Sequence, residues 1–280
     1  MASRIQSVDR ALRVLEAMAT EGRPLGLGEV AARVDLHIST VHRLLATLRA
    51  RSFVEQDEVT GRYRIGTAAL RVGSSFLSEM DLRPSLRPVL EGLAARSKET
   101  ANLVILQGLE AVYVDHVIGT KVAKFFTQVG QRVPLHCTAV GKVLMAFSSQ
   151  HQREALLSRI QLARFTKYTL TTRRALIDEI AKVRASGHAV DREEHEIGVA
   201  CLAAPIVDGS DQLTAAIGVS GPSGRILASV SALARVVQVA AFEASRSLGH
   251  ASSHKMPPGR TGTRRPVTSR RLKTRTLVHE

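Results

Sequence analysis

Residues 39–50 place short polar side chains and one arginine on one side of a predicted helix. Its apolar residues fall at helical spacing and form a single stripe, made of Val41, Leu44, Leu45 and Leu48. The opposite face holds Ser39, Arg43, Ala46 and Thr47, and no carboxylate. A helix that enters the major groove of DNA needs such a face, because small side chains permit close approach and carboxylates repel phosphate. Ser39 is the predicted N-cap.

The neighbouring segments predict the framework that positions this helix. A helix over residues 27–34 precedes it, and the break at residues 35–38 has the length of a helix-turn-helix turn. An earlier helix carries the stripe Val8, Ala11, Leu12 and Leu15, so three helices can share one core. Residues 53–65 form two strand-like arms around a Thr-Gly turn, a candidate wing whose Arg62 and Arg64 would reach phosphates or a minor groove. An ordinary α+β domain with Arg43 as a surface charge fits the same pattern, and the motif alone leaves both readings open.

A second group of residues, in the C-terminal half, has the chemistry of an anion site. Thr138 is the predicted cap of a helix whose apolar stripe is Val140, Val143, Leu144 and Phe147. The N–H groups near Ala139 and Val140 would then lack intrahelical acceptors, and such a helix start attracts anions. Asp191, Cys201 and Ser220 follow later in the chain. Taken singly, they suit a solvated acid, a packing thiol and a turn serine.

An enzyme is the alternative chemistry for this half. A Cys/His nucleophile or a zinc site could be built from His136, Cys137, Asp191, His195 and Cys201. The cysteines lie far apart, and the sequence has no short ligand pair such as Cys-x-x-Cys. We therefore expect no catalytic residues, no bound metal and no cofactor.

Composition and charge limit the class of protein. The chain has 280 residues and a net charge of +14, of which residues 251–280 carry +7 through eight basic residues and one acidic residue. This tail lacks apolar periodicity and is expected to be disordered, adding salt-dependent affinity for DNA. We find no run long enough to span a membrane and no signal peptide, so we expect a cytoplasmic protein. Cys137 and Cys201 are expected to be free thiols.

Pattern divides the chain into four parts. Residues 1–73 are the helical segments and hairpin, residues 74–90 are a linker helix containing Pro84 and Pro88, residues 91–250 mix strands with helices, and residues 251–280 are the tail. Buried strands are predicted at residues 103–106, 112–117, 203–207 and 215–219, and helices at residues 154–159, 174–184 and 226–248. Strands mixed with helices in this way predict an α+β domain.

Both halves resemble the IclR family of bacterial transcriptional regulators. Residues 7–16 (SVDRALRVLE), 39–48 (STVHRLLATL) and 63–66 (YRIG) resemble its N-terminal domain, and residues 134–146 (PLHCTAVGKVLMA) its effector domain. The stretch from residue 187 to 208 fits the family signature at Gly187, Asp191, Glu194, Cys201, Leu202, Ala203, Ile206 and Asp208. It departs at Val207, where an aromatic residue or histidine is usual.

The resemblance implies a winged helix-turn-helix domain, a connecting helix and a GAF-like effector domain, assembled as a homodimer or homotetramer on an inverted-repeat operator. The resemblance favours a repressor over an activator, with an affinity for DNA that is switched by a small organic acid. The alternative is a constitutive DNA-binding dimer without an effector. The DNA-binding residues we predict are Ser39, Thr40, His42, Arg43, Thr47, Arg62 and Arg64. The effector-binding residues that the resemblance implies are Ala139, Val140, Asp191, Cys201 and Ser220. Because like charges repel, we expect Asp191 to accept a hydrogen bond from a hydroxyl at the far end of the ligand, away from its carboxylate. A family serine is replaced by Gly218, which implies a missing hydrogen bond and room for a larger ligand.

Overall fold

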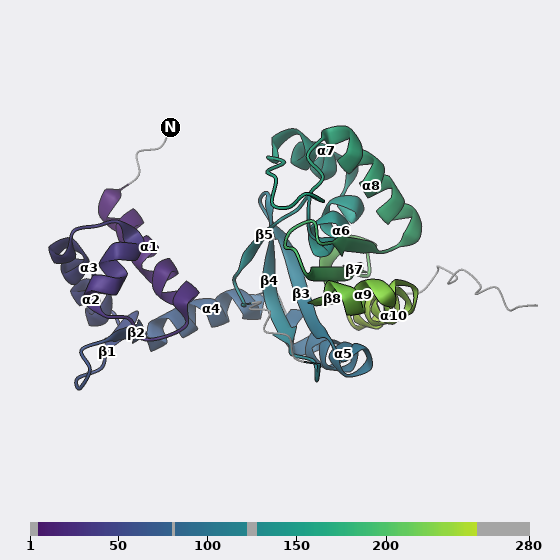
Figure 1. The fold of residues 1–280 in the computed structure, drawn as a ribbon. Helices are drawn as coiled ribbons and strands as arrows, with labels where there is room; N and C mark the ends of the chain where they lie inside the picture. The colour runs from purple at the N-terminus through teal and green to yellow at the C-terminus, as the bar shows by residue number, and fades with distance from the viewer. Residues whose placement is uncertain (1–4, 80–81, 122–127, 251–280) are drawn as a thin grey trace, which may run out of the picture.

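The structure, a computed structural model, describes residues 5–79, 82–121 and 128–250. Its N-terminal lobe contains three helices and a two-stranded antiparallel hairpin (Figure 1): α1 (Gln6–Glu21), α2 (Leu27–Val34), α3 (Ile38–Ala50), β1 (Val54–Gln56) and β2 (Tyr63–Ile65). Val14, Val30, Val41 and Leu45 are fully buried where the three helices meet. The predicted helix-turn-helix with its wing is therefore the architecture of this lobe.

Two details of the N-terminal lobe differ from the predictions. In α1 the buried residues are Val14 and Met18, whereas Val8 and Leu12 are 53% and 54% exposed. Apolar residues lie on two sides of this helix, and periodicity alone does not say which side meets α2 and α3. The N-cap of α3 is His37, not Ser39, because an imidazole nitrogen of His37 accepts the Ser39 N–H at 3.3 Å and supplies the acceptor that a cap requires.

Two helices connect the N-terminal lobe to the C-terminal lobe. Helix α4 (Thr67–Glu79) leads away from the hairpin, and α5 (Leu82–Ser97) packs on the C-terminal sheet (Figure 1). The predicted linker at residues 74–90 spans the end of α4 and the first half of α5. Leu86, Leu90 and Leu93 of α5 are buried against the sheet, so this helix forms part of the C-terminal core.

The C-terminal lobe is built on a six-stranded antiparallel sheet with the order β5-β4-β3-β8-β7-β6. The strands are β3 (Thr100–Gln107), β4 (Glu110–Val117), β5 (Arg132–Pro134), β6 (Ala189–Arg192), β7 (Val199–Val207) and β8 (Leu213–Pro222). Because successive side chains on a strand point to opposite faces, Leu103 and Ile105 pack on one side of the sheet and Val104 on the other.

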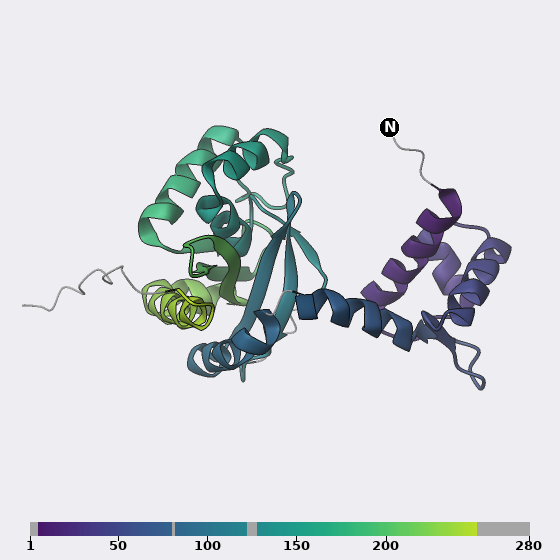
Figure 2. The ribbon, with the colours of Figure 1, turned by 180° about the vertical axis from the view of Figure 1, so that it is seen from behind.

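Helices cover both faces of this sheet, as Figures 1 and 2 show from opposite sides. One layer contains α5, α9 (Ser223–Ala228) and α10 (Val230–Ser247); the other contains α6 (Ala139–Phe147), α7 (Gln150–Arg159) and α8 (Arg173–Ser186). The helix predicted at residues 226–248 is interrupted at Ser229, where α9 ends and α10 begins. The four predicted strands are confirmed as parts of β3, β4, β7 and β8, and the α+β fold class is confirmed.

Within the described ranges, no helix is long and apolar enough to cross a membrane. The tail at residues 251–280, for which we predict disorder, lies outside the described residues.

Candidate ligand pocket and nucleic-acid interface

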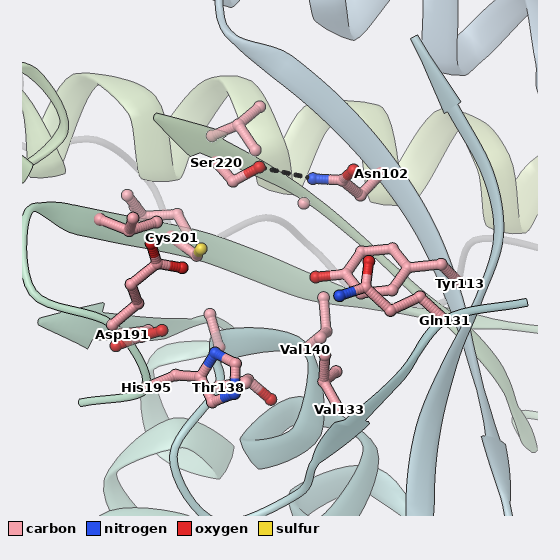
Figure 3. Close-up of a pocket in the computed structure, with 16 residues that line it drawn as sticks. Asn102, Tyr113, Gln131, Val133, Thr138, Val140, Asp191, His195, Cys201 and Ser220 are labelled. Atoms are coloured by element: carbon pink, nitrogen blue, oxygen red, sulfur yellow. Dashed lines mark hydrogen bonds between the residues drawn. The ribbon is translucent and has the colours of Figure 1, made fainter. Parts of the chain in front are cut away.

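A cavity of about 290 Å³ lies between the start of α6 and the sheet (Figure 3). The strands that form its floor place three of the predicted residues in one row. Cys201 on β7 is opposite Asp191 on β6 and opposite Ser220 on β8. All three line the cavity, as do Ala139 and Val140. The structure therefore brings together all five residues implied as effector-binding.

The start of α6 presents unpaired N–H groups to this cavity. The Thr138 hydroxyl accepts the Gly141 N–H at 3.1 Å, so the predicted cap is confirmed. In the described part of the chain, neither the Ala139 N–H nor the Val140 N–H has an acceptor. Gly141 permits this arrangement, because a Cβ at that position would lie 2.4 Å from the Leu135 Cα. The helix start is thus held tightly against the preceding loop, with two donors available for an anion.

Asp191 is a buried carboxyl group in this cavity, not the solvated acid that its sequence neighbours suggest. It is 2% exposed, and burial raises its pKa from 3.8 to about 7. The Glu194 N–H donates to its Oδ1 at 2.8 Å, and this bond and the Lys142 charge oppose the increase in pKa, while the Glu194 charge adds to it. Near neutral pH, Asp191 is therefore present in both protonation states and can either donate or accept a hydrogen bond.

Lys142 is a fully buried cation one turn into α6. Its Nζ donates to Glu194 at 2.7 Å, to Glu179 at 3.0 Å and to the Val190 carbonyl at 2.7 Å. Through these contacts it ties α6 to α8 and to the end of β6, next to Asp191. Lys142 is not among the site residues predicted from the sequence, although it is the single charged residue in a helix whose other side chains are apolar.

The opposite side of the cavity carries further polar groups that are not among the site residues predicted from the sequence. Figure 3 places Asp191 and Cys201 on one side and Tyr113 and Gln131 on the other. Near the top of that view, the Asn102 amide donates to the Ser220 Oγ at 2.9 Å. Asn102 is the only asparagine of the chain, and it interrupts the apolar run at residues 101–106 of β3. A polar residue in such a run is the signal that could have identified it.

Gly218 also lines the cavity, but it does not provide the room that the sequence suggests. A Cβ at Gly218 would lie 2.4 Å from the Leu202 carbonyl oxygen and 3.0 Å from the Ala203 Cβ. The space of a side chain is already taken by β7, which approaches β8 closely here. The glycine therefore reflects strand packing and does not by itself indicate a larger ligand.

The residues of the alternative enzyme site do not form reactive groups. Burial raises the pKa of the Cys137 thiol to about 12 and that of Cys201 well above 9.0, so both are thiols near neutral pH. A nucleophilic cysteine needs the opposite shift. The His136 imidazole bonds to the Ala163 carbonyl at 2.9 Å, and Cys137 does not line the cavity. His195 lines the cavity and packs against Phe165 with the rings tilted by 49° and 5.1 Å between ring centroids.

The predicted nucleic-acid residues differ in exposure and in the partners that their side chains already have. Ser39, His42, Arg43 and Thr47 are exposed on α3, and Thr40 is half-buried. Arg62 of the wing is bound to Glu29 at 2.9 Å and to the Pro24 carbonyl at 3.1 Å, and Arg64 to Glu55 at 2.9 Å. To contact phosphate, the wing arginines must exchange these partners. On α3 the Ser39 hydroxyl is paired with the His37 Nδ1 at 2.8 Å and the Thr47 hydroxyl donates to the Arg43 carbonyl at 3.0 Å, whereas the side chains of His42 and Arg43 have no hydrogen-bond partner among the described residues.

Comparison with known proteins agrees with both halves of the structure. The model of the IclR helix-turn-helix domain matches residues 7–58, and that of the bacterial transcriptional regulator IclR C-terminal domain matches residues 74–246. The chain is 34% identical over 247 residues to the HTH-type transcriptional regulator XynR of Escherichia coli strain K12, covering 88% of this chain and 98% of the relative. It is 37% identical over 224 residues to the transcriptional repressor IclR of the same strain, covering 79% and 82%.

Solved structures show the same architecture. The crystal structure of the Thermotoga maritima IclR superposes with a TM-score of 0.74 at 28% identity, covering 88% of this chain and all of that one. These relatives are transcription regulators, and none of them is an enzyme.

Proposed function

The chain belongs to the IclR family of bacterial DNA-binding transcriptional regulators, and we propose that it is a cytoplasmic repressor whose operator affinity is switched by a small organic acid. The observation that carries the proposal is the cavity itself. Two N–H donors without acceptors at the start of α6 face a buried Asp191 that can hold a proton. A repressor without an effector has no need for such a cavity.

The acid's carboxylate would bind the Ala139 and Val140 N–H groups, where the helix dipole favours negative charge. Asp191 lies close enough to this helix start for its charge to raise the Cys137 pKa. An ionised Asp191 would repel a carboxylate there, but a protonated Asp191 can donate a hydrogen bond to it. This assigns Asp191 to the carboxylate end of the ligand, not to a distant hydroxyl. Cys201, beside Asp191, would contribute a soft, weakly polar contact.

On the DNA side, the protein would act as a dimer or a dimer of dimers on an inverted repeat, since two recognition helices related by a two-fold axis match a two-fold operator. Ser39, Thr40, His42, Arg43 and Thr47 of α3 would enter the major groove. Switching requires that the acid bind the two DNA-affinity states unequally. An IclR homologue of the same fold from Microbacterium hydrocarbonoxydans, 22% identical to this chain, is known in complex with 4-hydroxybenzoate.

The test removes one donor of the anion site at a position whose helix backbone is compatible with proline. Ala139 is the first residue of α6, where proline is well tolerated, and Thr138 has the extended backbone that a following proline requires. We expect Ala139→Pro to weaken the binding of substituted benzoates in calorimetry by about 10- to 100-fold, since a charge-assisted hydrogen bond is lost. The matched control is Gln150→Pro at the first position of α7, which should bind like wild type.

Operator DNA is selected from a randomised duplex pool with the wild-type protein. The affinity of wild type, Ala139→Pro and Gln150→Pro for this DNA is then measured by fluorescence anisotropy with and without each acid. We expect the acids to lower operator affinity for wild type and for Gln150→Pro, and to have little effect on Ala139→Pro. Equal acid binding by wild type and Ala139→Pro would remove the anion site from the proposal, and acids that bind without changing operator affinity would leave a constitutive repressor.

A further inference from the structure

The hydrogen bond between Asn102 and Ser220 determines which chemical group the far side of the cavity can receive. The Asn102 Nδ2 donates to the Ser220 Oγ at 2.9 Å and lies 3.4 Å from the Thr100 carbonyl oxygen. That carbonyl can only accept, which identifies the nitrogen of the amide. Ser220 is therefore the acceptor in this pair, and its own O–H hydrogen is directed elsewhere.

That hydrogen has no acceptor in the described part of the chain, and Ser220 lines the cavity. Gln131 repeats this arrangement at the cavity edge. Its Oε1 accepts the Gln128 N–H at 3.1 Å, which leaves the amide N–H₂ of Gln131 available. Together with the two N–H groups of α6, the cavity thus offers donors at both ends.

The position of Asn102 has a cost that an apolar residue would avoid. Asn102 is 3% exposed, and its Oδ1 is buried without a hydrogen-bond partner among the described residues. An unpaired buried acceptor destabilises the folded state. What the asparagine contributes in return is the donor that fixes the Ser220 hydroxyl.

We propose that the effector carries a second hydrogen-bond acceptor, a carbonyl or carboxylate oxygen, across from its anchoring carboxylate, and that Asn102 is the positioning residue that makes Ser220 donate to it. The inference rests on the proposed function, since it assumes that an organic acid occupies the cavity. If the inference is correct, the effector does not carry at this position a group that can only donate a hydrogen bond.

The experiment uses three pairs of acids, each of nearly equal shape, measured by calorimetry with the full-length protein. In the first pair, 4-acetylbenzoate has an acceptor where 4-isopropylbenzoate has a methyl group. In the second pair, 4-aminobenzoate has a donor where 4-methylbenzoate has a methyl group. The pair 4-oxopentanoate and 4-methylpentanoate repeats the acceptor comparison on a smaller, flexible ligand. Within each pair, the ratio of the two dissociation constants measures the contribution of the one group by which the acids differ.

For wild type we expect 4-acetylbenzoate to bind about tenfold tighter than 4-isopropylbenzoate, with no comparable gain for the amine. Ser220→Ala should reduce the acceptor preference to within about twofold. Ser245→Ala, which also removes a buried serine hydroxyl but far from the cavity, should keep it.

Asn102→Asp tests the positioning role with almost no change in shape. At pH 8 an ionised Asp accepts the Ser220 O–H, so the serine presents a lone pair, and the preference should move from the acetyl to the amino compound. If Asn102 had only a structural role, its replacement would change the affinities for all the acids together. The ratios for the acceptor pair and for the donor pair would then stay as in wild type. If Asn102→Asp proves unstable, Asn102→Leu leaves the Ser220 hydroxyl free to donate or to accept. 4-Aminobenzoate should then also gain over 4-methylbenzoate, and the preference for an acceptor over a donor should disappear.

An unchanged ratio in the Asn102 variants, or a wild type that prefers the amine or neither group, would overturn this inference while leaving the carboxylate anchor at α6 intact. Failure of every acid to bind would instead contradict the proposed function itself.

Discussion

The two lobes treat charged and polar side chains in opposite ways. In the N-terminal lobe, the arginines of the wing and α2 form pairs at the surface, such as Arg64 with Glu55, whose side chains are 64% and 39% exposed. In the C-terminal lobe, Lys142 is fully buried with Glu194. The difference agrees with the functions proposed for the two lobes: a DNA-binding surface works while in contact with water and salt, whereas a ligand cavity must hold its polar groups in place before the ligand arrives.

The largest expected effect comes from breaking the buried ion pair. We expect Lys142→Met to lower the free energy of unfolding by about 3 to 5 kcal/mol, because it leaves Glu194 buried and uncompensated. Chemical denaturation of both proteins measures the loss. The control, Arg174→Ala, breaks the exposed pair with Asp178 and should cost less than about 1 kcal/mol.

A double variant, Lys142→Met with Glu194→Gln, sharpens this prediction. If the loss comes from an uncompensated carboxylate, neutralising Glu194 should recover part of it. A double variant as unstable as the sum of the two single ones would show that lost packing, not charge, causes the effect.

The next effect concerns the proton on Asp191. Its pKa of about 7 in the folded state lies above its ordinary 3.8, so the folded protein binds more protons than the unfolded chain between about pH 4 and pH 7. Its contribution to the free energy of unfolding is therefore greatest at low pH and is lost as the pH rises through about 7. We expect Asp191→Asn to remove this dependence and to be more stable than wild type at pH 8 by about 2 to 4 kcal/mol.

Denaturation of both proteins between pH 4 and pH 8 gives the test, since other titrating groups contribute equally to both. The same proton should make wild type bind 4-acetylbenzoate more tightly as the pH falls through 7, and Asp191→Asn should lose that trend. If the difference in free energy of unfolding between wild type and Asp191→Asn stays constant with pH, the raised pKa of Asp191 is contradicted.

The sequence predicted these two lobes unequally, for physical reasons. The α3 stripe and the Thr138 cap depend on residues within one or two helical turns, so periodicity and capping chemistry located them. Asp191, Cys201 and Ser220 meet only through strand pairing, and resemblance to a known family, not local pattern, brought them together. Asn102 and Lys142 were missed because their roles depend on partners 118 and 52 residues away in the chain, Ser220 and Glu194. His37 displaced Ser39 as the cap because the start of a helix depends on backbone geometry that composition does not specify.

The smallest expected effects separate the free arginine of the recognition helix from the paired arginines of the wing. Arg43 is exposed on α3, and its replacement by Ala should weaken operator binding by about 1 to 3 kcal/mol if it reads a base edge. Arg64 must first leave Glu55, so the gain from a phosphate contact is reduced by the pair that it gives up. We therefore expect Arg64→Ala to cost less than about 1 kcal/mol of operator affinity.

Anisotropy titrations over a range of salt concentrations distinguish the two arginines. If Arg64 binds phosphate, its removal lowers the slope of log affinity against log salt by about 1 and weakens all sequences equally, whereas loss of a base contact at Arg43 relaxes sequence preference at one position. A salt slope unchanged by Arg64→Ala would mean that the wing keeps its arginine paired in the complex, and that α3 alone among these two elements supplies a cationic contact to the DNA.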